Sequence, residues 1–269
     1  MSYTLDEIEN AKAALGVAGQ IVSLAKESPE LTEAGQKFAD SALVLSKAVN
    51  NVLLPIAAVN FAFDKGRKYF DEKFQKDLEG KASNIAPEDV VEPKASVAAP
   101  VLQGLAFSHE EPSLKDMYLS LLRTAMNRSE ADTAHPAYAE VIKQLSAVEA
   151  PLLLLVLKGK SPSPIVKLNR KVESAKGEVL IKSHLIPWID GSGNQKEIPG
   201  VISMIENWRR LGLVDIQYDA HLTNETLYDW VTLRPEYIAL KEEIGDSLEI
   251  GKGYYLITEF GKSFAKAVS

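Results

Sequence analysis

The chain has 269 residues, of which 46% are hydrophobic and 25% charged, and its formal net charge is −7. These proportions are those of an ordinary globular protein and exclude a disordered chain or a fibrous repeat, while the length suits two lobes of about 100 to 200 residues. The absence of cysteine excludes disulfide bonds, thiolate zinc sites and cysteine nucleophiles. The acidic start MSYTLDEIEN lacks the features of a secretory signal, which predicts a cytoplasmic protein.

The charge is unevenly distributed along the chain. Residues 1–149 hold 15 Lys and Arg against 22 Asp and Glu, whereas residues 150–269 hold 15 of each. The N-terminal part therefore carries the whole net charge and is a poor candidate for nucleic-acid binding, since phosphate contacts need a basic surface. A nucleic-acid role stays open for the C-terminal part.

The first predicted domain, residues 1–86, is a helical hairpin or bundle. Apolar residues recur at steps of three, four and seven over residues 5–25 and again over 31–49, which is typical of two amphipathic helices joined by a short loop. The same period continues on one face of the charge-rich run DKGRKYFDEKFQKDLEG. The two prolines of SNIAPEDVVEPK then predict a connector.

A stretch in this first domain, residues 41–63, has Lys47 as its single charge. It is long enough for a membrane-spanning helix, which needs about 20 apolar residues. Polar and helix-breaking residues interrupt it, namely Asn50, Asn51, Pro55 and Asn60, and unpaired amides are costly in hydrocarbon. We predict a buried core helix, with membrane association on activation as the alternative.

The second predicted domain, residues 87–145, is a compact helical block. Ser113 and Asp116 have the spacing of a capping box, in which each residue satisfies a backbone N–H of the first helical turn, and would open the helix SLKDMYLSLLRTAMN. Pro136 suits the first turn of the next helix.

The third predicted domain, residues 146–269, begins with a second capping box, Ser146 with Glu149, ahead of the apolar run PLLLLVLK. We expect that run to be a core helix buried on every side. A helix over 198–211, stopped by Gly212, precedes the strand LVDIQY. After a polar insertion, residues 219–250, the pattern predicts a returning strand GYYLI and a final helix capped by Thr258.

These elements together predict a mainly α protein: a helical bundle followed by a small α+β module that resembles the second half of a winged helix-turn-helix. Residues 85–267 also resemble the Abi-alpha family. The distinctive parts are the proline-marked connector into VAAPVLQGL, the helix MYLSLLRTAMN, and the helix from His135-Pro136 to Gln144-Leu145-Ser146. The resemblance implies a bacterial abortive-infection protein that acts in phage defence, and it brings no catalytic residues with it.

A search for chemistry favours a protein that is not an enzyme and has no catalytic, cofactor-binding or metal-binding residues. Phe260-Gly261-Lys262-Ser263 imitates the end of a phosphate-binding loop, but the loop's first glycine is replaced by Leu256. The four histidines, His109, His135, His184 and His221, lack the spacing of a zinc site and are expected to be surface or capping residues.

The most positive segment is a candidate binding surface. Residues 158–182 hold seven cations against Glu173 and Glu178, a balance of +5; the cations are Lys158, Lys160, Lys167, Arg170, Lys171, Lys176 and Lys182. In a winged helix they could lie beside Arg209 and Arg210 and meet a phosphate backbone. The favoured interpretation is a solvated loop whose charges face the acidic N-terminal lobe.

Three hypotheses of function follow. The first is an interaction protein of phage defence whose partner is another protein, such as a phage component. The second is a nucleic-acid-binding regulator that uses the nine basic residues above. The third is a membrane effector that inserts residues 41–63.

Overall fold

The computed structural model describes residues 60–269 except 173 and 175, with side chains from residue 65 onward. The predicted hairpin of residues 5–25 and 31–49 lies outside the described residues, as does nearly all of the stretch 41–63. Within the described part of the chain, no helix has the combination of length and apolarity that crossing a membrane requires.

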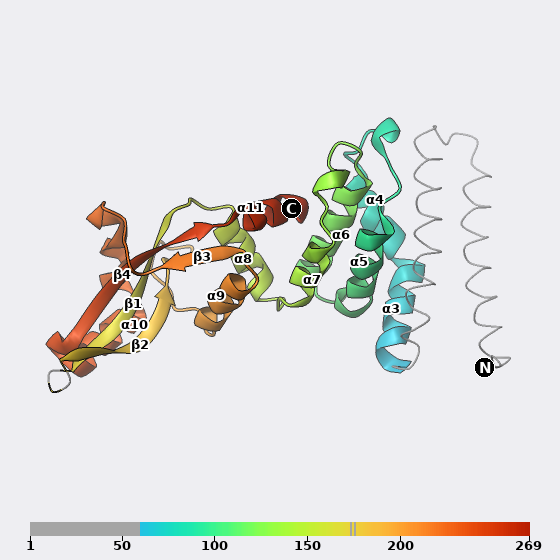
Figure 1. The fold of residues 1–269 in the computed structure, drawn as a ribbon. Coiled ribbons are helices and arrows are strands. Elements are labelled where there is room, and N and C mark those ends of the chain that lie inside the picture. Colours follow the sequence, from blue (N-terminus) through green and yellow to red (C-terminus); the bar gives the residue numbers. More distant parts are fainter. Residues whose placement is uncertain (1–59, 173, 175) are drawn as a thin grey trace, which may run out of the picture. The chain divides into compact units, whose positions relative to one another are not determined.

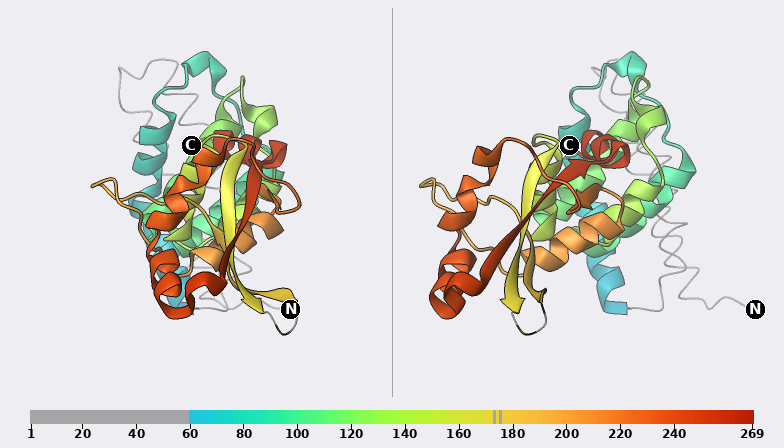
Figure 2. Two further views of the ribbon diagram at one scale, coloured as in Figure 1. Left: turned by 90° about the vertical axis from the view of Figure 1, so that its left-hand side faces the viewer. Right: turned by 60° about the vertical axis from the view of Figure 1, so that its left-hand side comes forward.

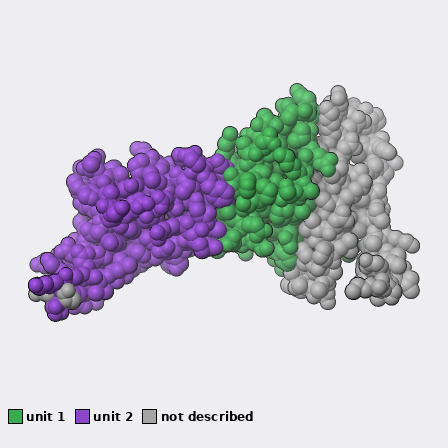
Figure 3. Space-filling model, viewed as in Figure 1, with its two compact units in different colours: residues 1–151, 266–269 green, residues 152–265 purple. Residues whose placement is uncertain are grey.

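The fold is mixed α+β, with a helical region followed by a four-stranded antiparallel sheet (Figure 1). It separates into two compact units, shown in different colours in Figure 3. The first unit comprises residues 1–151 together with 266–269, and the second comprises residues 152–265.

The first unit is built from helices whose apolar faces meet in one core. They are α3 (Asn60–Glu72), α4 (Phe74–Ala82), α5 (Ala95–Ser108), α6 (Pro112–Met126) and α7 (Ala137–Lys143), with short 3₁₀ turns η2 (Pro87–Asp89) and η3 (Ala131–Thr133). Helices α5 and α6 pack closely because Gly104 leaves room for the ring of Tyr118. The end of the chain belongs to this core, since Val268 is buried and the Thr124 hydroxyl donates to the carbonyl of Ala267 over 2.9 Å.

The two predicted capping boxes have different outcomes. Ser146 and Glu149 form one as predicted, because each backbone N–H donates to the other's side chain over 3.2 and 3.1 Å. The box at Ser113 is wrong: α6 starts with Pro112 in its first turn, and the Ser113 hydroxyl donates to the carbonyl of Ala147 instead. The proline fixes the helix start without a hydroxyl cap.

Helix α8 (Glu149–Leu157) contains the apolar run that was predicted to be buried on every side. Leu153, Val156 and Leu157 are buried, but Leu155 is 64% exposed. The prediction is therefore wrong for the face of the helix that carries Leu155. Apolar composition alone does not bury a helix on every side, because apolar atoms still make up much of the exposed surface of a folded protein.

The sheet of the second unit contains β1 (Ser163–Val172), β2 (Gly177–Leu185), β3 (Val214–Gln217) and β4 (Leu248–Ile257) in the order β2-β1-β4-β3. Figure 2 shows β1 and β4 running side by side, and their antiparallel register extends from Ser163 opposite Tyr255 to Arg170 opposite Leu248. The hairpin of β1 and β2 corrects the favoured interpretation of residues 158–182 as a solvated loop. The backbone of β1 is paired with β2 on one side and with β4 on the other, and the apolar residues Ile165, Val166 and Leu168 of β1 are buried in the core.

The elements predicted after residue 198 are present. They are α9 (Val201–Arg210), β3, the returning strand β4 and α11 (Glu259–Ala267). Gly212 has a left-handed φ of 71° after α9, and the Thr258 hydroxyl accepts the N–H of Gly261 at the start of α11. Gly261 is required by close packing rather than by a phosphate, since a Cβ there would lie 2.2 Å from the carbonyl oxygen of Leu213.

The polar insertion is folded and covers one face of the sheet. It contains the 3₁₀ segment η5 (Glu225–Leu233), helix α10 (Pro235–Ile244) and the turn η6 (Gly245–Ser247). Its buried residues Tyr228 and Val231 pack with three residues of the hairpin, Val166, Leu168 and Leu185. The insertion is also fastened by Arg234, which is fully buried, pairs with Glu236 and donates to the carbonyl of Lys196 over 2.7 Å.

Candidate functional site

The nine basic residues named from the sequence do not form one surface. Seven of them follow the β1–β2 hairpin: Lys158 and Lys160 precede β1, Lys167, Arg170 and Lys171 lie in β1, Lys176 lies in the turn, and Lys182 lies in β2. At about 3.3 Å per residue, the 10 residues of β1 separate the two ends of the hairpin by about 30 Å. Arg209 and Arg210 are the last residues of α9.

Several of these charges are already engaged. Lys171 lies 3.9 Å from Glu249, and Lys182 lies 3.1 Å from Glu197. Lys167 rests over the ring of Tyr218, and Arg210 donates to the side chain of Asn207. Among the described residues, Lys158, Lys160, Arg170 and Lys176 have no ion-pair partner. The hairpin is therefore less basic than its sequence indicates, and its unpaired cations divide between its two ends.

The end of the hairpin near the turn carries an unusual apolar surface. Val179 and Leu180 are each 56% exposed, and Ile181 is 37% exposed. Arg170 lies opposite Val179 in the register, and Lys171 lies opposite Glu178. We call the set Val179, Leu180, Ile181, Arg170, Lys171 and Lys176 the hairpin edge. It combines three consecutive exposed apolar side chains with three cations.

The backbone of the hairpin edge is also available. Strand β2 is the first strand in the order β2-β1-β4-β3, so it pairs with β1 on one side only. Because successive side chains point to opposite faces of a strand, Val179 and Leu180 leave apolar surface on both faces of this edge. Exposed apolar edge strands of this kind pair readily with another strand.

A cluster of polar side chains lies further along the same hairpin, where β2, α9 and the end of β3 meet. His184 is buried and has a left-handed φ of 55°. Its Nε2 lies 2.5 Å from Oε1 of Glu206, and its Nδ1 lies 3.1 Å from the hydroxyl of Tyr218. We call His184, Glu206, Tyr218 and Lys167 the His184 cluster. The sequence-based expectation that His184 is a surface or capping residue is wrong.

The protons of the His184 cluster are closely constrained. The Tyr218 hydroxyl accepts the backbone N–H of His184 and has one proton to donate, either to the carbonyl of Val166 at 3.3 Å or to Nδ1 of His184. Both ring nitrogens of His184 therefore have a hydrogen-bonding partner, the Tyr218 hydroxyl for Nδ1 and the Glu206 carboxyl for Nε2.

Two glycines of β4 make room for the cluster on the face of the sheet. A Cβ at Gly251 would lie 2.6 Å from the side chain of Lys167, and one at Gly253 would lie 2.6 Å from the ring of Tyr218. Burial, more than any other influence, raises the pKa of Tyr218 to about 12. The half-buried phenol therefore stays protonated at neutral pH and serves as a hydrogen-bonding link between β1, β2 and the end of β3.

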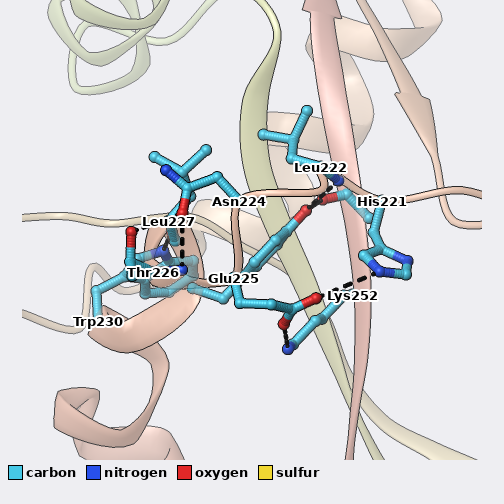
Figure 4. A network of polar contacts seen from close by, with 10 residues as sticks. His221, Leu222, Asn224, Glu225, Thr226, Leu227, Trp230 and Lys252 are labelled. Atoms are coloured by element: carbon cyan, nitrogen blue, oxygen red, sulfur yellow. Dashed lines mark hydrogen bonds and ion pairs between the residues drawn. The ribbon is translucent and has the colours of Figure 1, made fainter.

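A third polar network fastens the insertion to β4 (Figure 4). Glu225 pairs with Lys252 of β4 and lies 3.5 Å from His221, and the contact with Lys252 lowers the pKa of the Glu225 carboxyl. The Tyr228 hydroxyl donates to the carbonyl of Gly253 over 2.7 Å and accepts the N–H of Leu222. Each polar group in this network has a partner in the fold, which indicates a structural role.

The remaining histidines follow the sequence-based expectation more closely. His135 is exposed and its Nδ1 accepts the N–H of Ala137, as a capping residue does. His221 is exposed, while His109 follows α5 and stacks on Tyr69. Within residues 60–269, apart from the two omitted positions, no group of three or more His, Asp or Glu is arranged to hold a metal ion.

The hairpin edge and the His184 cluster were not recognised in the sequence as sites. A signal for the first is present in the three consecutive apolar residues Val179-Leu180-Ile181, which lie within a segment dominated by lysine and arginine. For the second, the apolar neighbours Leu185, Ile186 and Trp188 indicate burial of His184. Its partners, Glu206 and Tyr218, are 22 and 34 residues away and could not be predicted from the residues around His184.

Comparison with curated proteins and with solved structures found no match. A family model described as abortive infection alpha matches residues 66–268, a range that begins in α3 and ends one residue before the end of the chain. This range contains the hairpin edge and the His184 cluster. The chain therefore belongs to the abortive infection alpha family, and this membership implies a role in phage defence.

Proposed function

We propose that the protein acts in phage defence by binding a protein partner, without catalytic chemistry of its own, and that the hairpin edge is the contact surface. The observation that carries this proposal is the exposure of Val179, Leu180 and Ile181 in consecutive positions. Single exposed apolar residues are common on proteins, but a contiguous exposed apolar group rimmed by charge is typical of an interaction site.

The composition of the hairpin edge supports a protein partner. Buried apolar side chains provide most of the binding free energy at such interfaces, and charged residues at the rim favour the correct partner and speed its association. The surrounding rim contains Arg170 and Lys176, which have no ion-pair partner among the described residues. The His184 cluster contributes indirectly by joining the inner end of β2 to α9 and β1.

A phage challenge tests this proposal. Cells that express the wild-type protein are compared with cells that express the double variant Val179→Ser/Leu180→Ser. The control is Ile238→Ser, which removes an apolar side chain with 47% exposure from α10. We expect the wild type and the control to reduce plaque formation on a sensitive phage, and the double variant to lose at least tenfold of that protection.

The outcomes separate the parts of the proposal. Full protection by the double variant, at equal protein level, would show that the hairpin edge is not the contact surface. If the wild type protected against no phage in a broad panel, the role in defence itself would lose its support.

Nucleic-acid binding is the second candidate, since α9, β3, β4 and α11 occur in the order of the second half of a winged helix, although η5, α10 and η6 stand between β3 and β4. The unpaired cations favour it, but they are split between the two ends of the hairpin. Binding of duplex DNA at low salt, weakened by Arg209→Ala/Arg210→Ala and by added salt, would favour this candidate. No shift at low salt would remove it.

A further inference from the structure

We propose that β2 binds an extended, acidic segment of the partner by strand addition, so that this segment becomes a fifth strand beside residues 177–181. This inference rests on the proposed function and specifies the chemistry of the partner. Main-chain hydrogen bonds would supply affinity, and the side chains on either side of the strand would supply selectivity.

The first argument is the state of the backbone at this edge. Strand β2 pairs with β1 from Val172 opposite Gly177 to Asn169 opposite Leu180, and no other strand of the described sheet pairs with it. In an antiparallel pair, the residues alternate between those whose N–H and C=O face the partner strand and those whose groups face away. About half of the polar backbone groups of residues 177–181 therefore face outward, ready for another strand.

The second argument is the distribution of protective features along β2. Natural edge strands avoid unwanted pairing through bulges, charges and covering loops. The inner half of β2 has such features: the register shifts between Leu180 and Lys182, and Lys182 is held by Glu197. The outer half presents the exposed Val179 and Leu180 instead, and the exposed Ile181 lies at the register shift where the two halves meet. Pairing is thus discouraged in one half of the strand and left open in the other.

The third argument is charge, which selects the occupant. Arg170 lies directly across from Val179, Lys176 immediately precedes the strand, and neither has an ion-pair partner among the described residues. Lys171 is 60% exposed, and its contact with Glu249 is as long as 3.9 Å. The acidic residue on the outer half of β2, Glu178, is already bound by Asn169 over 2.6 Å. Carboxylates on an added strand would find cations on both faces.

Two other occupants fit less well. A second copy of this chain would add the same surplus of cations, and its one carboxylate on the outer half of β2, Glu178, is already bound by Asn169. A membrane would satisfy the apolar side chains and attract the cations, but the outward backbone groups of β2 would have no hydrogen-bond partner in hydrocarbon. A strand of a protein satisfies the side chains, the charges and the backbone together.

The test uses the full chain and a short synthetic peptide of alternating glutamate and valine. Its controls are the same peptide with lysine for glutamate and the same peptide with a central proline, which cannot complete a strand ladder. Binding is measured by fluorescence anisotropy and located by amide NMR. We expect the acidic peptide to shift the amides of residues 177–181, and both control peptides to bind at least tenfold more weakly.

Matched variants test the cations. Arg170→Ala/Lys176→Ala should weaken binding of the acidic peptide at least fivefold. Lys158→Ala/Lys160→Ala removes the same number of cations from the other end of the hairpin and should leave the affinity unchanged. Equal binding of the lysine or proline peptide, or shifts confined to other elements, would overturn the inference. So would sedimentation as a dimer through β2, or binding of the chain to phosphatidylglycerol vesicles that Leu180→Ser abolishes.

The phage challenge and the peptide experiment can fail separately. If Val179→Ser/Leu180→Ser abolishes protection while the acidic peptide does not bind, the hairpin edge remains the contact surface and strand addition is wrong. If the acidic peptide binds at β2 but the same variant still protects, the strand edge is real and the proposed function is wrong.

Discussion

The imidazole of His184 and the carboxylate of Glu206 approach within 2.5 Å, although the two residues are separated by 22 positions and only the histidine is buried. This contact joins the end of β2 to α9. The histidine is fixed from its other side by Tyr218, which makes it the centre of a network rather than one half of a surface pair. Such a network is sensitive to the loss of any member.

We expect His184→Ala to lower the free energy of unfolding by about 2 to 4 kcal/mol, because it opens a cavity and removes the hydrogen bonds of the imidazole with Tyr218 and Glu206. The matched control is His221→Ala, which breaks an exposed contact of 3.5 Å with Glu225 and should change stability by less than about 0.5 kcal/mol. Urea unfolding of the two variants measures both values. Equal effects would contradict a structural role for the buried network.

The Tyr218 phenol should lose its proton at a higher pH than an exposed tyrosine does. Burial raises its pKa from 10.0 to about 12, so the neutral phenol is favoured by the fold. The resulting stabilisation is fully present below pH 10 and is lost as the pH rises through about 12. The difference in absorbance titration between wild type and Tyr218→Phe should show an inflection near 12 in the folded chain. In denaturant the inflection should return to about 10, and an inflection there in the folded chain would argue against burial.

Two helical glycines should respond in opposite directions to the same substitution. In α5, a Cβ at Gly104 would lie 2.1 Å from Cζ of Tyr118, so Gly104→Ala should destabilise the protein by about 1 to 3 kcal/mol through overpacking. In α4, a Cβ at Gly80 meets nothing within 4 Å, and Gly80→Ala should stabilise by about 0.5 to 1 kcal/mol through helix propensity. Thermal unfolding of both variants measures the contrast. If both variants were more stable than the wild type, helix propensity would outweigh the contact with Tyr118 at Gly104. If both were less stable, the gain in helix propensity expected at Gly80 would be absent.

The buried ion pair of Arg234 and Glu236 should tolerate joint replacement better than the loss of one partner. Glu236→Gln leaves a fully buried guanidinium without a counter-charge and should cost about 3 to 5 kcal/mol. The double variant Arg234→Met/Glu236→Leu should cost less than the sum of the costs of Arg234→Met and Glu236→Leu made singly. Denaturant unfolding of this double-mutant cycle gives the coupling, and Glu140→Gln, at an exposed contact of 3.9 Å with Lys143, is the surface control. Additive effects would contradict direct coupling of the pair.

Much of the secondary structure could be predicted from short patterns. Ser146 and Glu149 cap a helix through contacts three residues apart, and Thr258 caps the last helix in the same way. The apolar period of α9 and its stop at Gly212 are local as well. Predictions of this type succeed because the interacting groups are close in sequence. The predicted capping box at Ser113 is wrong because the Ser113 hydroxyl donates to a carbonyl 34 residues away instead.

The hairpin was missed for a related reason. Residues 158–182 contain enough lysine to resemble a solvated loop, yet the pairing of Leu168 with Ile250 and the packing of Tyr228 bury Val166 and Leu168 of β1. Burial of a strand depends on what lies across and above it, and these neighbours are 60 to 82 residues away along the chain. The charges then point outward from a paired backbone.

The sequence by itself determined the type and ends of most helices, the order of the C-terminal elements and the family to which the chain belongs, because each depends on residue types at short, fixed spacings. Only the tertiary structure decided that Val179, Leu180 and Ile181 lie exposed on the free edge of a sheet, and that His184 is buried against Glu206 and Tyr218. The exposure of a side chain and its contacts depend on the residues that the fold brings next to it, and these residues cannot be identified from spacings in the sequence.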